Sequence, residues 1–264
     1  MPTNKLNDLT GSQWLFRSKS VIKKNYGQGS FAHKIRRLNK ACKPPELCKD
    51  IIEIFSHKGD LVLDPFAGTG GIVIGSQMAG RRAVGCEINK SYIDAYGLAC
   101  EEIGGLFKTF NKESILHQSF FDMDNQEVDL VFTDPPYFDM DSRTKSRRHH
   151  KDKGYLERPM EAFTGVLFKD LDAWKTFIFD FCKKSFEMVK NGKHMVSFME
   201  DMYIEGEYIF LTDILCQEAK KVGWIPQGEY IWYNEARRPS FFGYPVKMIT
   251  SRTHTSILFF KKIL

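Results

Sequence analysis

The pattern of apolar and polar positions changes character near Leu61. From there, short apolar runs alternate with longer stretches in which apolar residues recur every three or four positions. Such an alternation of strand and helix patterns predicts an α/β fold. The predicted strands are 61–63, 83–86, 107–110, 128–132, 194–199, 229–233 and 255–260, and the predicted helices are 43–55, 72–78, 91–103, 172–190 and 209–222.

The sheet is expected to be mostly parallel and twisted, with helices on both faces. Strands 229–233 and 255–260 are expected to pair, which places an antiparallel strand near the C-terminus. With 264 residues and a hydrophobic content of 42%, the chain is long enough to bury one substantial core. We therefore predict a single domain over 1–264.

Two segments differ from this regular pattern. Residues 11–56 precede the first strand and form an N-terminal arm that ends in the helix over 43–55, which begins on consecutive prolines, as suits a first helical turn. Residues 138–171 are charged and have no strong period. A stretch this long without regular structure inside a compact domain is usually functional or mobile, so we interpret it as an excursion from the domain.

The net charge of +5 is modest, but the positive residues are concentrated. Residues 11–40 contain eight Lys/Arg and no Asp or Glu, and residues 143–153 contain six Lys/Arg and one Asp. Such segments are typical of a polyanionic partner, although solvated loops would look the same. The candidate nucleic-acid contacts are Arg143, Lys145, Arg147, Arg148, Lys151, Lys153, Arg237 and Arg238.

The six cysteines include no Cys-x-x-Cys pair and no metal-ligand spacing with the seven histidines. We therefore predict reduced thiols and no metal site. The sequence contains no signal-peptide pattern and no apolar run of membrane-spanning length. A cytoplasmic protein without a membrane partner is expected.

The first stretch with chemical character is Leu61 to Gly71, which reads Leu-Val-Leu-Asp-Pro-Phe-Ala-Gly-Thr-Gly-Gly. It predicts a buried strand that ends at a carboxylate, Asp64, and passes through a glycine loop into a helix. Glycines allow the backbone to approach a ligand closely, and a helix N-terminus offers free N–H groups. Many nucleotide and phosphate sites use such a loop, so alone it is weak evidence.

A second stretch narrows the choice. Strand 128–132 is followed by Thr133 and then by Asp134, Pro135, Pro136 and Tyr137. Together with Phe66-Ala67-Gly68-Thr69-Gly70, this motif resembles the S-adenosylmethionine (AdoMet) dependent amino-methyltransferases. Their AdoMet loop has the pattern Phe-x-Gly-x-Gly, and their catalytic loop reads Asp/Asn/Ser-Pro-Pro-Tyr/Phe.

The resemblance implies a Rossmann-like AdoMet methyltransferase fold and AdoMet as cofactor. An acid at the end of the second strand holds the ribose in this family, which assigns that role to Glu87; helix capping is the alternative. The segment from Asn39 to Leu47 resembles the family's closing element, although Asn39-Lys40 stands where relatives often have His-Pro. The implied cofactor-binding residues are Asp64, Phe66, Ala67, Gly68, Thr69, Gly70, Glu87, Ile88, Lys43 and Pro44.

Asp-Pro-Pro-Tyr suits methylation of an exocyclic amine. The lone pair of such an amine is delocalised into the base, and two acceptors aimed at its N–H groups favour a pyramidal nitrogen. Asp134 and the Pro135 carbonyl are the candidate acceptors, consecutive prolines such as Pro136 fix the backbone, and Tyr137 is expected to stack on a flipped base. The chain has no Pro-Cys pair, which argues against a covalent cytosine-carbon methyltransferase.

The order of the motifs is most similar to DNA methyltransferases acting on adenine N6 or cytosine N4, with adenine favoured. Duplex DNA is then the substrate, and excursion 138–171 the candidate target-recognition segment. Association with the nucleoid follows, and a homodimer or a companion restriction or specificity subunit is possible. The alternatives are a transfer-RNA guanine-N2 methyltransferase and an AdoMet-binding subunit that reads DNA without catalysis.

Overall fold

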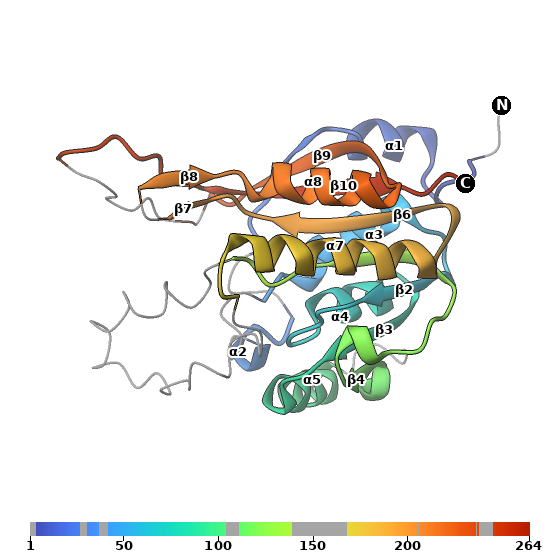
Figure 1. The fold of residues 1–264 in the computed structure, drawn as a ribbon. Helices are drawn as coiled ribbons and strands as arrows, with labels where there is room; N and C mark the ends of the chain where they lie inside the picture. The colour runs from blue at the N-terminus through green and yellow to red at the C-terminus, as the bar shows by residue number, and fades with distance from the viewer. Residues whose placement is uncertain are drawn as a thin grey trace.

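Eight strands of the part of the chain described here form one mixed sheet with helices on both faces (Figure 1). The computed structural model describes residues 4–26, 31–36, 42–103, 111–138, 168–204, 206–235, 237 and 245–264. The helices are α1 (Gly11–Arg17), α2 (His33–Arg36), α3 (Pro45–Phe55), α4 (Gly71–Met78), α5 (Lys90–Ile103), α7 (Leu171–Met188) and α8 (Leu211–Val222). The strands are β1 (Val21–Lys23), β2 (Leu61–Asp64), β3 (Arg82–Glu87), β4 (Ile115–His117), β5 (Val128–Thr133), β6 (Val189–Met199), β7 (Met202–Ile204), β8 (Glu207–Ile209), β9 (Ile225–Tyr233) and β10 (His254–Lys261).

The strand order is β1-β9-β10-β6-β5-β2-β3-β4, and β10 runs antiparallel to both of its neighbours. The other pairs in this sheet are parallel. The mostly parallel sheet with an antiparallel strand near the C-terminus is therefore confirmed. From β2 the chain moves outward to β3 and β4, then returns to place β5 on the other side of β2. The carboxyl ends of β2 and β5 meet at this reversal, where α/β folds bind their ligands.

Successive residues of the central strands face opposite layers of the core, as the two-residue period of a strand requires. Val62 and Leu130 belong to the apolar cluster that contains α3, whereas Leu63 and Val131 belong to the cluster that contains α7 and α8. Figure 1 shows α7 and α8 on one side of the sheet and α3 on the other. Because both faces are covered, these strands read as continuous apolar runs.

Most predicted elements are present, with shifted ends. The helix predicted over 172–190 ends at Met188, because Val189 already begins β6 and pairs with Val128. The strand predicted near 107–110 lies outside the described residues. Strand β4 was not predicted; only one of its three residues, Ile115, is buried, so the hydrophobic signal is weak. The short strands β1, β7 and β8 were also not expected.

Helix α3 and helix α4 pack closely enough to bring the N-terminal segment over the glycine loop. Pro45 occupies the first turn of α3, and its carbonyl oxygen would lie 2.7 Å from a Cβ added at Gly75 of α4. A side chain at Gly75 would therefore push the helices apart. The residues just before α3, including Lys43, are held above the N-terminus of α4 by this packing.

Candidate active site

The glycine loop connects β2 to α4 through two residues in the left-handed region. Gly68 has φ 54° and Gly70, the N-cap of α4, has φ 77°. Glycine adopts these angles without the steric cost of a Cβ. The loop is tied to the sheet by a 2.9 Å hydrogen bond from Ala67 N–H to the Cys86 carbonyl.

Close contacts on two sides of the loop also require glycine at Gly70 and Gly71. A Cβ at Gly70 would overlap the ring of Tyr96 from α5, and a Cβ at Gly71 would lie 2.5 Å from the Lys43 carbonyl oxygen. The loop is thus clamped between α5 and the segment before α3. Arg36 adds to this clamp, because its buried guanidinium donates to the Lys43 carbonyl and its own carbonyl accepts from Thr69 Oγ1 at 3.2 Å.

Asp64 lies at the carboxyl end of β2 and is 2% exposed. Its carboxylate accepts hydrogen bonds from Thr133 Oγ1 at 2.7 Å and from Phe66 N–H at 3.2 Å. Burial outweighs these bonds and raises the pKa of Asp64 to about 7. A ligand cation above the loop would favour its charged form.

Glu87 ends β3, and both of its carboxylate oxygens accept backbone hydrogen bonds. Gly68 N–H donates at 2.8 Å and Asn89 N–H at 2.7 Å, while burial raises the pKa of the carboxyl group. The bond to Asn89 is the capping contact weighed from the sequence, and the bond to Gly68 braces the loop. Each carboxylate oxygen has a second lone pair, so the predicted contact with the ribose is compatible with both backbone hydrogen bonds. Its neighbour Ile88 is 40% exposed.

The Asp-Pro-Pro-Tyr corner follows β5 directly. Tyr137 donates its hydroxyl hydrogen to Asp134 Oδ1 at 2.6 Å, and the Lys43 ammonium pairs with Asp134 Oδ2 at 2.9 Å. The indole N–H of Trp174, fully buried in α7, donates to the Pro136 carbonyl at 2.9 Å. Sequence reasoning missed Trp174, because no motif marks a residue that acts through a backbone carbonyl.

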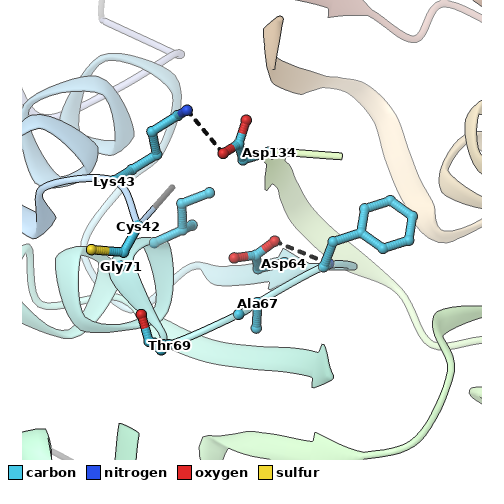
Figure 2. Close-up of a pocket in the computed structure, with 10 residues that line it drawn as sticks. Cys42, Lys43, Asp64, Ala67, Thr69, Gly71 and Asp134 are labelled. Atoms are coloured by element: carbon cyan, nitrogen blue, oxygen red, sulfur yellow. Dashed lines mark hydrogen bonds and ion pairs between the residues drawn. The ribbon is translucent and has the colours of Figure 1, made fainter. Parts of the chain in front are cut away.

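One pocket joins the two motifs (Figure 2). Figure 2 shows Lys43 and Asp134 facing each other on one side, with Asp64 and the glycine loop on the other. The pocket is lined by Cys42, Lys43, Asp64, Phe66, Ala67, Gly68, Thr69, Gly71, Ile72 and Asp134. The structure therefore brings together most of the residues predicted to bind the cofactor and the carboxylate predicted to act in catalysis.

Of the eight basic residues predicted to contact nucleic acid, only Arg237 lies within the described part of the chain. Arg237 points inward, and its two terminal nitrogens pair with the two carboxylate oxygens of Glu200 at 3.1 and 3.0 Å. Glu200 follows β6 and was not singled out from the sequence. The other predicted contacts lie outside the described residues: Arg143, Lys145, Arg147, Arg148, Lys151, Lys153 and Arg238.

The described residues contain no group of three or more His, Cys, Asp or Glu side chains that could hold a metal ion. In the same part of the chain, no helix is long and apolar enough to cross a membrane. All six cysteines are free thiols, and four of them are buried.

The pocket fits AdoMet in its donor set. The glycine loop and the N-terminus of α4 form a cradle that added Cβ atoms would fill, and carboxylates stand at the ends of β2 and β3. These groups suit a ligand that carries hydroxyl donors and positive charge. Lys43, which the sequence assigned to cofactor binding, turns its ammonium toward Asp134 (Figure 2).

The chain resembles enzymes of two substrate classes. Over 119 residues it is 29% identical to tRNA (guanine(10)-N2)-dimethyltransferase of Methanocaldococcus jannaschii, covering 43% of this chain and 34% of that protein. Over 54 residues it is 52% identical to DNA adenine methyltransferase YhdJ of Escherichia coli, covering 19% of this chain and 17% of that protein. The matched stretches thus span about a third or less of these relatives.

The fold also matches a solved structure. A SAM-dependent methyltransferase from Methanosarcina mazei aligns with a TM-score of 0.52 and 12% identity, covering 81% of this chain and 97% of that one. This likeness supports the Rossmann-like methyltransferase fold. A family model described as DNA methylase, of the N6/N4 methyltransferase type, matches residues 3–97 and 128–263. This match supports AdoMet as the cofactor. Because it spans most of the chain, the chain belongs to this DNA methylase family.

Proposed function

We propose that the protein transfers a methyl group from AdoMet to the exocyclic amine of a base flipped out of duplex DNA, with adenine N6 favoured over cytosine N4. The observation that carries this proposal is the Asp134 carboxylate, held by Tyr137 and Lys43 beside the glycine-loop pocket. Both features lie where β2 and β5 end next to each other. An acceptor for an amine and a site for a methyl donor are therefore neighbours.

The residues of the corner have separable roles in this proposal. Asp134 accepts a hydrogen bond from one N–H of the target amine, and the Pro135 carbonyl accepts from the other. These two acceptors favour a pyramidal nitrogen whose lone pair points toward the pocket. The indole N–H of Trp174 donates to the Pro136 carbonyl and so holds this geometry. Rate enhancement then comes from positioning and preorganised electrostatics, without a covalent protein intermediate.

AdoMet supplies an electrophilic methyl group on a sulfonium. On the protein side, Glu87 is proposed to hold the ribose hydroxyls, and the loop from Phe66 to Gly70 to contact the remainder of the cofactor. Asp64, Ile88 and Pro44 complete the proposed site. The buried carboxylate of Asp64 favours a cationic ligand over a neutral one.

DNA recognition rests on the charge pattern. The excursion over 138–171, together with Arg237 and Arg238, is proposed to provide target recognition within a single domain over 1–264. Arg237 would then contribute indirectly, by fixing Glu200 and the start of its loop. We also propose that the protein associates with the nucleoid. Its protein partner would be a second copy of the chain or a companion restriction or specificity subunit.

Methylation of guanine N2 in transfer RNA is the second candidate. Two archaeal tRNA (guanine(10)-N2)-dimethyltransferases match 43% and 47% of this chain, at 29% and 27% identity. These are longer matches than that to E. coli YhdJ, although the identity is lower. The family match favours DNA.

One experiment separates these functions. Purified protein is incubated with labelled AdoMet and, in parallel, with mixed-sequence duplex DNA and total transfer RNA. Mass spectrometry of the digested nucleosides then distinguishes N6-methyladenine, N4-methylcytosine and N2-methylguanine. We expect N6-methyladenine from DNA and none with Asp134→Ala. Label only in transfer RNA would replace the DNA proposal with the RNA one, and no label in either would support a subunit that binds AdoMet without catalysis.

A further inference from the structure

Lys43 occupies a position that neither the glycine loop nor the Asp-Pro-Pro-Tyr corner explains. Its ammonium lies 2.9 Å from Asp134 Oδ2, and the side chains of Lys43 and Asp134 are 11% and 19% exposed. The nitrogen also lies 5.8 Å from the centre of the Tyr137 ring and 5.0 Å from that of Phe198. Lys43 therefore lines the pocket and is paired directly with the carboxylate predicted to act in catalysis.

The backbone of Lys43 is fixed from two sides, which limits where its side chain can reach. Its carbonyl oxygen accepts from the guanidinium of Arg36, and it lies so close to Gly71 that a Cβ there would be 2.5 Å away. Pro44 follows as the N-cap of α3, with φ −62°. The side chain therefore starts from a rigid anchor and ends at Asp134.

Glu200 is a second carboxylate close to the same ammonium. Burial disfavours the charge on Lys43, but the nearby carboxylates of Asp134 and Glu200 outweigh it and raise the pKa of Lys43. Burial also disfavours the charge on Glu200, but the positive charges of Lys43 and Arg237 outweigh this effect and lower the pKa of Glu200 to about 2. Lys43 is thus a charged lysine that pairs with Asp134 and is stabilised further by the negative charge of Glu200.

Glu200 is itself firmly held. Besides the paired contacts from Arg237, its Oε1 accepts from Thr255 Oγ1 at 2.7 Å, and the residue is 8% exposed. Arg237 and Thr255 therefore fix Glu200, whose negative charge favours the charged form of Lys43. Such buried polar networks restrict their members to one arrangement.

The Asp134 carboxylate is held from two sides, by side chains from different parts of the chain. Asp64 also lies close enough for its carboxylate to interact electrostatically with that of Asp134. The Lys43 ammonium contacts Oδ2, while the Tyr137 hydroxyl donates to Oδ1. Each oxygen keeps a lone pair for the target amine. The direction of the acceptor is set in this way.

We propose that Lys43 is a positioning residue of the methyl-transfer site, which aims the Asp134 carboxylate at the target amine through the ion pair at Oδ2. The inference rests on the proposed function, because Asp134 needs aiming only if an amine reacts there. It reassigns Lys43 from the cofactor-binding role that the sequence suggested.

The test compares Lys43→Met, Lys43→Arg and a matched control in the full chain. The control is Lys193→Met, since Lys193 pairs with Asp60 at 3.0 Å with side-chain exposures of 24% and 18%, away from the Asp134 pair. We measure kcat and KM with the nucleic acid that the wild type methylates, and the Kd for AdoMet by calorimetry. Lys43→Met should lower kcat roughly 10²-fold, the loss typical of a misplaced reacting group, with KM and the AdoMet Kd nearly unchanged.

Lys43→Arg should recover much of the lost kcat, because it keeps the positive charge, while Lys193→Met should behave as wild type. An unchanged kcat in Lys43→Met would overturn the proposal. A weakened AdoMet Kd with normal kcat would return Lys43 to cofactor binding, and an arginine variant no better than methionine would leave only a packing role. If Lys43→Met does not fold, Lys43→Gln replaces it, and kcat must then fall at constant AdoMet Kd. A wild type without methyl transfer would instead refute the proposed function.

Discussion

Thr133 donates its hydroxyl hydrogen to Asp64 Oδ1 at 2.7 Å, across 69 positions of sequence. This bond joins the last residue of β5 to the last residue of β2. Each of these strand ends leads into one of the two motifs, so the bond holds the glycine loop and the Asp-Pro-Pro-Tyr corner in one fixed relationship. Transfer between a donor in the pocket and an acceptor at Asp134 depends on that relationship.

Asp134→Ala is predicted to abolish methyl transfer and leave AdoMet affinity nearly unchanged. Asp134 is proposed to accept from the reacting amine, and losing one such preorganised contact costs roughly 10²–10³ in rate. Single-turnover kinetics and calorimetry measure the two quantities separately. A mutant that no longer binds AdoMet would give Asp134 a role in building the pocket.

Glu87→Ala is predicted to have the opposite effect. Hydrogen bonds to a charged group contribute about 1.5–3 kcal/mol each, so the Kd for AdoMet should rise roughly tenfold or more, while nucleic-acid binding is retained. The variant also loses the bonds to Gly68 and Asn89. Thermal unfolding without cofactor therefore serves as the control for a loosened loop. An AdoMet Kd equal to that of the wild type would exclude the ribose contact.

Gly70→Ala is predicted to destabilise the fold by more than about 1 kcal/mol, because the residue combines φ 77° with a Cβ that would overlap Tyr96. Gly97→Ala is the matched control. Gly97 lies within α5, and apart from the helix's own backbone no atom lies within 4 Å of its added Cβ, so alanine there should stabilise the helix by up to about 1 kcal/mol. Urea unfolding of both variants decides the point, and equal effects would contradict the structural argument.

Asp64 is predicted to make stability depend on pH. Burial raises its pKa from 3.8 to about 7, so its contribution to stability is fully present below the unfolded value and is lost as the pH rises through about 7. Asp64→Asn removes this dependence. The free energy of unfolding of the variant, relative to wild type, should therefore increase between pH 5 and pH 8. A difference that stays constant over this range would show that the carboxyl group titrates normally.

Arg147→Ala with Arg148→Ala is predicted to weaken duplex binding for all sequences. If both side chains contact phosphates, the slope of log affinity against log salt should fall by about 0.9 for each lost contact. Titrations with duplex DNA at several salt concentrations measure that slope. An unaltered slope would shift the main electrostatic contact to the basic residues between 11 and 40.

The sequence by itself determined the fold class, the strands that carry the two motifs and the family. These features are local: a buried strand reads as an apolar run, and Gly68 and Gly70 stand where the backbone must turn. Asp134 and Tyr137 are recognisable because two prolines between them leave few conformations.

Tertiary structure decided which distant groups meet at the acceptor. Lys43 and Trp174 come from distant parts of the chain, and no spacing along the sequence relates them to the Asp-Pro-Pro-Tyr corner. Their proximity depends on the order of β6, β5 and β2 in the sheet and on the close packing of α3 against α4. Arg237 likewise reads as a free cation in the sequence, and only the fold places it on Glu200. Such contacts arise from packing between elements, which a local pattern does not encode.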